Sequence, residues 1–269
     1  MKEVTFGQYY PSNSFVHKMD ARIKILLTIA YIVGVFLVSG ENYYLGYIVA
    51  FAFLLFTTLV SKIPLGKMLK SIKAVIFFVV FSAVLQLFFN KTGEPVWENG
   101  FIYWGGIKNA GFIIFRILLI VMWASLLTFT TSPVEISDGI EGLLYPLKWI
   151  KFPVHEFALI MSIALRFIPT LLDETERIIK AQKARGADFE TGGLLKRAKA
   201  IVPILIPLLI SSFRRADELA DAMDARCYSG SKNRTKFKKL TLTYRDLVGV
   251  LLIGGLIYGL ILLNGVVIL

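Results

Sequence analysis

The sequence is poor in the residues that build disulfides and metal sites. Its 269 residues include one cysteine, Cys227, which excludes an intramolecular disulfide. The two histidines, His17 and His155, are far apart in the chain, without neighbouring cysteines or paired acids at ligand spacing. We therefore expect no bound metal.

Motifs for nucleotide chemistry and hydrolysis are also missing. The chain has no Gly-x-x-x-x-Gly-Lys-Ser/Thr loop, so it does not bind nucleotide by that means, and no Ser/His/Asp set or membrane metalloprotease signature. Asp217, Asp221 and Asp224 share one helical face, which we expect to be solvated or paired with Arg214 and Arg215. These absences predict a protein that is not an enzyme and has no cofactor.

Acidic residues are scarce as well. Lysine and arginine total 30 against 19 aspartate and glutamate, which gives a net charge of +11 and a pI of about 9.6. The basic residues flank apolar runs, a distribution typical of membrane proteins rather than of nucleic-acid-binding proteins. We expect the lipid bilayer, and no nucleic acid, as a partner.

Apolar sequence is abundant. Hydrophobic residues make up 56% of the chain and the mean hydropathy is +0.66, more apolar than a soluble domain of this size. The pattern therefore predicts an all-α integral membrane protein with about five transmembrane helices. The predicted spans are 23–38, 43–60, 74–89, 107–130 and 247–269.

The region between the fourth and fifth spans has a different character. Its apolar pieces, 157–172 and 201–213, alternate with charge and contain prolines, so neither resembles a full span. If both crossed the membrane, the basic segment 180–199 would face outside, which the positive-inside rule disfavours. We therefore expect a cytoplasmic domain of long amphipathic helices. The predicted organisation is 1–132 for the first four spans, 133–246 for this cytoplasmic domain and 247–269 for the last span.

Arg116 lies inside the fourth apolar run. A charge at that depth is costly and faces protein, water or a counter-charge. One interpretation places it on a translocation path. The other, which we favour, makes it a buried partner for helix packing or a side chain that extends to the membrane surface.

Two short motifs stand at the ends of the long helical patterns in the cytoplasmic region. The sequences Ala181–Gly186 and Ala222–Cys227 both read Ala-x-x-Ala-Arg followed by a small residue, and they are 41 residues apart. Each arginine is expected at a helix C-terminus, where the helix dipole favours a cation, and Gly186 is a plausible residue just beyond the first helix. Helix capping alone would explain one such arginine, whereas the matched pair indicates a docking device for another protein.

These motifs, together with their context, resemble a known family. The run 127–135, the sequence Leu165–Pro169, and the ends Ala184-Arg185-Gly186 and Ala225-Arg226-Cys227 are similar to the transmembrane T component of energy-coupling factor (ECF) transporters. The similarity extends over nearly the whole chain and is densest from about 127 to 228. Two X-Arg-X motifs at helix ends are specific to this family when they occur together in this context.

The resemblance implies a scaffold subunit in a bacterial or archaeal plasma membrane. It implies docking of two ABC-type ATPase subunits, a separate substrate-binding membrane S component, and ATP-driven uptake of vitamins or other micronutrients. The resemblance assigns this docking role to six residues: Ala184, Arg185, Gly186, Ala225, Arg226 and Cys227. A self-sufficient permease remains the alternative, supported only by Arg116, and a membrane-embedded enzyme has no motif in its favour.

The asymmetry of lysine and arginine predicts the topology. On the five-span layout the N-terminus is cytoplasmic and the C-terminus is outside. Every lysine and arginine except Lys91, Lys108 and Arg116 is then on the cytoplasmic side. Reporter fusions after Ser231 and after Leu269 should therefore report opposite sides of the membrane. Finding both reporters on one side would remove the final span.

Overall fold

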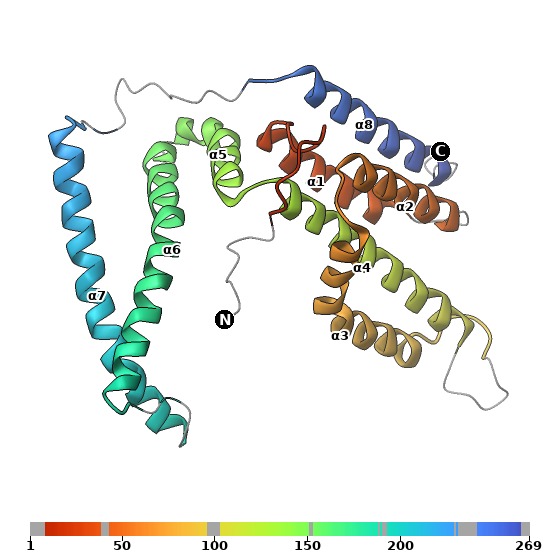
Figure 1. Ribbon diagram of the computed structural model, residues 1–269. Helices are drawn as coiled ribbons and strands as arrows, with labels where there is room; N and C mark the ends of the chain where they lie inside the picture. The colour runs from red at the N-terminus through yellow and green to blue at the C-terminus, as the bar shows by residue number, and fades with distance from the viewer. Residues whose placement is uncertain are drawn as a thin grey trace. The chain divides into compact units, whose positions relative to one another are not determined.

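The computed structural model describes residues 9–38, 43–95, 103–150, 153–187, 189, 193–228, 230 and 241–264. Within these residues every regular element is helical, which confirms the predicted all-α class (Figure 1). The helices are α1 (Ala21–Leu37), α2 (Tyr43–Val60), α3 (Leu65–Phe89), α4 (Trp104–Thr130), α5 (Pro133–Leu144), the 3-10 helix η1 (Tyr145–Ile150), α6 (Val154–Ala184), α7 (Leu194–Ala225) and α8 (Tyr244–Asn264).

The chain divides into two compact units. The first contains Met1–Leu143 and Leu240–Leu269, and the second contains Leu144–Lys239. In the first unit, α3, α4 and α8 are long and apolar enough to cross a membrane, while α2 is a shorter apolar helix. The 17-residue α1 covers the remaining predicted span.

The third helix begins earlier than the predicted span. We expected the span to start at residue 74, after a basic connection, but the structure continues the helix back to Leu65. Pro64 holds the extended position just before that helix, and the lysines that follow it are good helix formers. Apolarity marks the membrane-spanning part of a helix, whereas the helix itself ends only where a breaker interrupts it.

The helix α4 forms the centre of the first unit, with α1, α2 and α3 packed against it. The rings of Tyr31 on α1 and Trp123 on α4 stack at 3.9 Å, and Phe53 on α2 stacks on the same indole at 5.7 Å. The hydroxyl of Tyr31 donates to the carbonyl of Ala50 at 3.0 Å, so the polar tip of this fully buried ring is satisfied.

A buried polar cluster joins the ends of α1, α4 and α8. The Asp246 carboxylate of α8 accepts one bond from the backbone N–H of Thr243 (2.7 Å) and one from that of Asp20 (2.8 Å), so it caps α8 and holds it against the start of α1. The ammonium of Lys24 donates to the carbonyls of His17 (3.0 Å) and Thr130 (3.1 Å), which ties α1 to the last turn of α4.

The segment before α1 folds onto this cluster. The backbone N–H of Tyr10 donates to the carbonyl of Phe129, and His17 Nε2 lies 2.9 Å from the carbonyl of Tyr10. Since a carbonyl only accepts, Nε2 carries the proton and Nδ1 accepts from the Ser14 hydroxyl at 2.6 Å. Burial lowers the pKa of His17, which favours the neutral imidazole that this arrangement requires.

Arg116 connects the opposite end of α1 to α4. Its guanidinium donates from Nη2 to the carbonyl of Val38, the residue that ends α1, at 3.2 Å, and from Nε to the hydroxyl of Tyr47 at 3.1 Å. It also lies over the ring of Phe36, 5.3 Å from its centroid. A cation at a helix C-terminus is stabilised by the helix dipole and by the unpaired carbonyls there. This is the packing arrangement that we favoured from the sequence.

The contacts of Arg116 predict a graded loss of stability. Arg116→Met removes both hydrogen bonds and leaves the Val38 carbonyl unpaired, which should cost about 1.5–3 kcal/mol. Tyr47→Phe removes one of the two bonds and should cost less. Thermal unfolding in detergent would measure both changes, with Phe115→Leu, at an exposed position on the same helix, as the control. Full stability of Arg116→Met with loss of transport would instead favour a role on a translocation path.

Candidate functional site

The two long helices of the second unit form an antiparallel pair. The guanidinium of Arg215 on α7 binds the carboxylate of Glu174 on α6 at 3.1 Å, and the side-chain amide of Gln182 donates to the carbonyl of Pro203 at 3.4 Å. Contacts that advance along α6 therefore run backwards along α7 (Figure 1).

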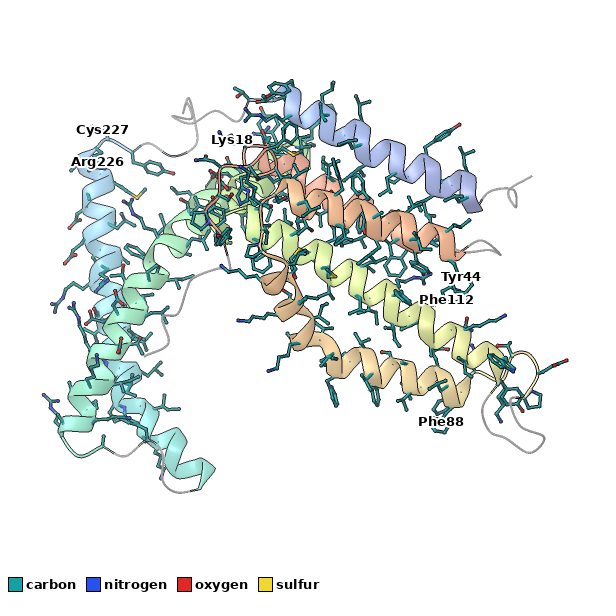
Figure 2. The ribbon with its side chains drawn as sticks, turned by 45° about the vertical axis from the view of Figure 1, so that its right-hand side comes forward. Lys18, Tyr44, Phe88, Phe112, Arg226 and Cys227 are labelled. Carbon is teal, nitrogen blue, oxygen red and sulfur yellow. The ribbon has the colours of Figure 1, made fainter. Side chains whose placement is uncertain are left out.

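This arrangement places the two arginine motifs at opposite ends of the pair. Gln182, close to Arg185, lies against Pro203, and 23 residues of α7 separate Pro203 from Arg226. At 1.5 Å per residue that length of helix is roughly 35 Å. Figure 2 shows Arg226 and Cys227 at the end of α7.

The first motif ends α6 with a Schellman cap. Arg185 is the last half-helical residue, and Gly186 follows with φ +87°. The N–H of Gly186 donates to the carbonyl of Lys183, and the N–H of Ala187 donates to that of Gln182, both at 3.0 Å. The prediction that Gly186 is the residue just beyond the helix is confirmed.

The second motif ends α7 in the same way. Arg226 is the C-cap, and the next residue, Cys227, has φ +57°. The N–H of Cys227 donates to the carbonyl of Asp224 at 2.9 Å, and that of Tyr228 donates to the carbonyl of Met223 at 3.0 Å. The two motifs therefore end their helices with the same backbone conformation. Cys227 occupies the left-handed position, which glycine adopts without strain.

Both arginine side chains are available for an external partner. Arg185 and Arg226 are exposed, as are the small residues Ala184, Gly186, Ala225 and Cys227. Among the described residues, no acid forms an ion pair with either guanidinium. The backbone N–H groups of each cap bind carbonyls of the last turn, Gln182 and Lys183 in α6 and Met223 and Asp224 in α7, so these carbonyls do not require the guanidinium donors.

The acidic face of α7 is solvated, one of the two arrangements that we expected. Asp217, Asp221 and Asp224 are all exposed. Arg215, which we considered as a partner for this face, binds Glu174 on α6 instead, and both of these side chains are about a quarter exposed. This ion pair was not singled out from the sequence, because the residues that meet across α6 and α7 depend on how the two helices pack.

The helix pair also exposes a large apolar surface. Seven large apolar residues of α7 between 201 and 213 are exposed, although a helix of a soluble protein buries such residues. They are Ile201, Val202, Leu205, Ile206, Leu209, Ile210 and Phe213. The second unit therefore combines an exposed arginine at each end of the helix pair with an apolar middle section on α7.

Comparison with known proteins agrees with these features. Residues 12–237 match the CbiQ family, described as cobalt transport proteins. The chain is 50% identical over 250 residues to the energy-coupling factor transporter transmembrane protein EcfT of Ruminiclostridium cellulolyticum, an alignment that covers 92% of each protein. It is also 49% identical to EcfT of Clostridium kluyveri, over 93% of each protein, and 41% identical to EcfT of Bacillus subtilis, over 96% of this chain and 98% of the relative.

The chain belongs to the EcfT family. It is therefore a membrane component of an ECF transporter, as the resemblance of its motifs implied. The region matched by the CbiQ family, residues 12–237, includes both Schellman caps and the helix pair that carries them.

The caps predict a position-specific response to substitution. Gly186→Ala places a side chain at φ +87° and should destabilise the end of α6 by about 1 kcal/mol, whereas Cys227→Gly should relieve strain and stabilise the end of α7 by a similar amount. Hydrogen exchange of the amides at the two helix ends would measure both effects.

Gly254→Ala on α8 is the matched control for Gly186→Ala. Neither glycine has an atom within 4 Å of an added Cβ, but Gly254 lies inside a helix, where alanine is more favourable than glycine. Equal effects of the two alanine substitutions would contradict the assigned cap geometry.

Proposed function

We propose that this chain is the scaffold and coupling subunit of an ECF-type ABC importer. It links two cytoplasmic ATPases to a substrate-binding S component, and the complex imports vitamins or other micronutrients while the ATPases hydrolyse ATP. The observation that carries the proposal is the pair of exposed arginines, held in identical caps at opposite ends of one antiparallel helix pair.

The spacing of the arginines suits two partners. Roughly 35 Å of helix separates them, which is about the diameter of a small domain. Two ATPase subunits can therefore lie side by side, each in contact with one helix end. Because the two caps have the same backbone geometry, two identical or closely related subunits can use the same groove to bind them.

The chemistry of each end favours a groove that contains a carboxylate. The guanidinium is planar, always charged and able to donate two parallel bonds to one carboxylate, which lysine cannot do. The small neighbours, Ala184 and Gly186 at one end and Ala225 and Cys227 at the other, let a partner approach the helix end closely. We therefore assign the docking role to these six residues.

The apolar middle section of α7 supports the contact with an S component. A patch of this kind marks a protein or membrane interaction site, and a membrane-embedded S component offers an apolar surface that matches it. On this proposal α6 and α7 pass the motion of the ATPases to the S component, and the Glu174–Arg215 ion pair keeps the two helices in register as they move.

The proposed location is the plasma membrane of a bacterium, with a cytoplasmic N-terminus and an external C-terminus. The helix ends are compatible with this topology, since the start of α1, the end of α4 and the start of α8 meet in one polar cluster. A self-sufficient permease is less well supported, because Arg116 is engaged by the carbonyl of Val38 and the hydroxyl of Tyr47.

The docking role predicts a two-step loss of assembly. Arg185→Ala or Arg226→Ala should weaken the hold on one ATPase by about 2–5 kcal/mol, and the double variant should lose both. Lysine at either position should restore little, since it lacks the planar fork. ATPase pull-down, ATP-driven uptake and the amount of protein in the membrane would be measured for each variant.

Arg177→Ala on α6 and Arg214→Ala on α7 are the matched controls, because they remove an exposed arginine from the same helices away from their ends. These variants should assemble normally. A double variant of Arg185 and Arg226 that binds both ATPases and transports normally would refute docking, and the arginines would then be ordinary helix caps.

A further inference from the structure

A long apolar groove runs along α4 between α2 and α3. It has a volume of about 780 Å³ and is lined almost entirely by carbon. One end lies among Leu65 and Leu69 at the start of α3, and the other lies among Tyr44, Trp104 and Lys108 at the start of α2 and α4. The groove exists because α2 and α3 pack against α4 and make little contact with each other.

The polar groups of the groove gather at one end. The rings of Tyr44 and Trp104 are more than half exposed, as is usual for aromatic residues at the surface of a bilayer. Lys108 lies one turn further along α4, and no described residue forms an ion pair with it. Because helical side chains tilt towards the N-terminus, its ammonium extends back towards the level of Trp104.

Gly111 leaves the groove open where it borders α4. It lies on α4 one turn beyond Lys108, close to Phe112, whose ring lies 6.1 Å from that of Tyr44 (Figure 2). A Cβ added at Gly111 would meet no atom within 4 Å, so the space above this glycine is empty of protein.

We propose that this groove binds one phospholipid with an anionic headgroup. The phosphate lies against the ammonium of Lys108, between the aromatic rings of Tyr44 and Trp104, and an acyl chain follows the groove towards Leu65 and Leu69. The lipid comes from the membrane surface at which α4 begins, which is the outer one on the proposed topology.

Chemistry and position favour a lipid over a helix of a partner protein. The groove is apolar along its length, and its polar lining lies at the end where aromatic side chains mark a membrane surface, so an acyl chain and a headgroup match its two parts. Lys108 is the cation of the lining, and its ammonium attracts a negative headgroup. An exposed ion pair of this kind contributes up to about 1 kcal/mol, which is about fivefold in affinity.

The test uses the full-length chain purified with its partners in detergent. Native mass spectrometry would count the lipid retained when phosphatidylglycerol or phosphatidylcholine is added at equal concentration. We expect phosphatidylglycerol to be retained preferentially, and Lys108→Gln to reduce its affinity about fivefold and abolish the preference. Lys91→Gln, which removes an exposed lysine that does not line the groove, should change nothing.

A second substitution tests the groove itself. Gly111→Leu places a side chain in the groove, at a position where an added Cβ meets no atom within 4 Å, and should reduce retention of both lipids, whereas Gly254→Leu, at an equally open glycine on α8 outside the groove, should not. Unchanged retention in Gly111→Leu, or equal binding of the two lipids by the unmodified chain, would overturn the proposal. Loss of the S component from Gly111→Leu with lipid retention intact would assign the groove to a partner helix and would also overturn it.

Discussion

The carboxylate of Asp246 holds together parts of the chain that are 226 residues apart. One oxygen caps the start of α8, and the other accepts the backbone N–H of Asp20 at the start of α1. Lys24, one turn further along α1, connects α4 to the same cluster by donating to the last carbonyl of α4. Buried polar groups of this kind must be satisfied, because an unpaired one costs far more in an apolar environment than in water. The first unit therefore closes only when α8 returns to α1, although the whole second unit lies between them in sequence.

Two cations illustrate how charge is used inside an apolar bundle. Lys24 and Arg116 lie at opposite ends of α1, and each donates hydrogen bonds to backbone carbonyls, although Lys24 also lies in the same buried cluster as the carboxylates of Asp20 and Asp246. Carbonyls at the ends of helices lack intrahelical partners, so they accept from a cation without losing another bond. The exposed arginines of the second unit differ from these two cations, because the carbonyls beside them have other donors. There, backbone N–H groups of the caps bind two carbonyls in the last turn of each helix, and the guanidinium groups of Arg185 and Arg226 remain exposed to a partner.

The prolines of the second unit do not end its helices. Pro169, Pro203 and Pro207 each lie inside a helix of more than 30 residues, in keeping with the long amphipathic helices expected there. Each proline removes one backbone hydrogen bond, and packing between α6 and α7 helps to stabilise the helices that contain them. Local signals did mark the ends of helices. Ser132 and Glu135 form a reciprocal cap at the start of α5, and Gly186 ends α6 as its sequence position predicts.

The sequence by itself determined the features that depend on composition and on near neighbours. Apolar runs located the apolar helices of the first unit, because the apolarity of a segment depends on its own residues, and Gly186 marked a helix end, because only the local backbone decides that. The tertiary structure alone decided which distant groups meet. The antiparallel pairing that separates Arg185 from Arg226, the partners of Arg116 and the groove between α2 and α3 all depend on how whole helices pack. Such packing is set by many weak contacts between segments far apart in the chain, which no local pattern records.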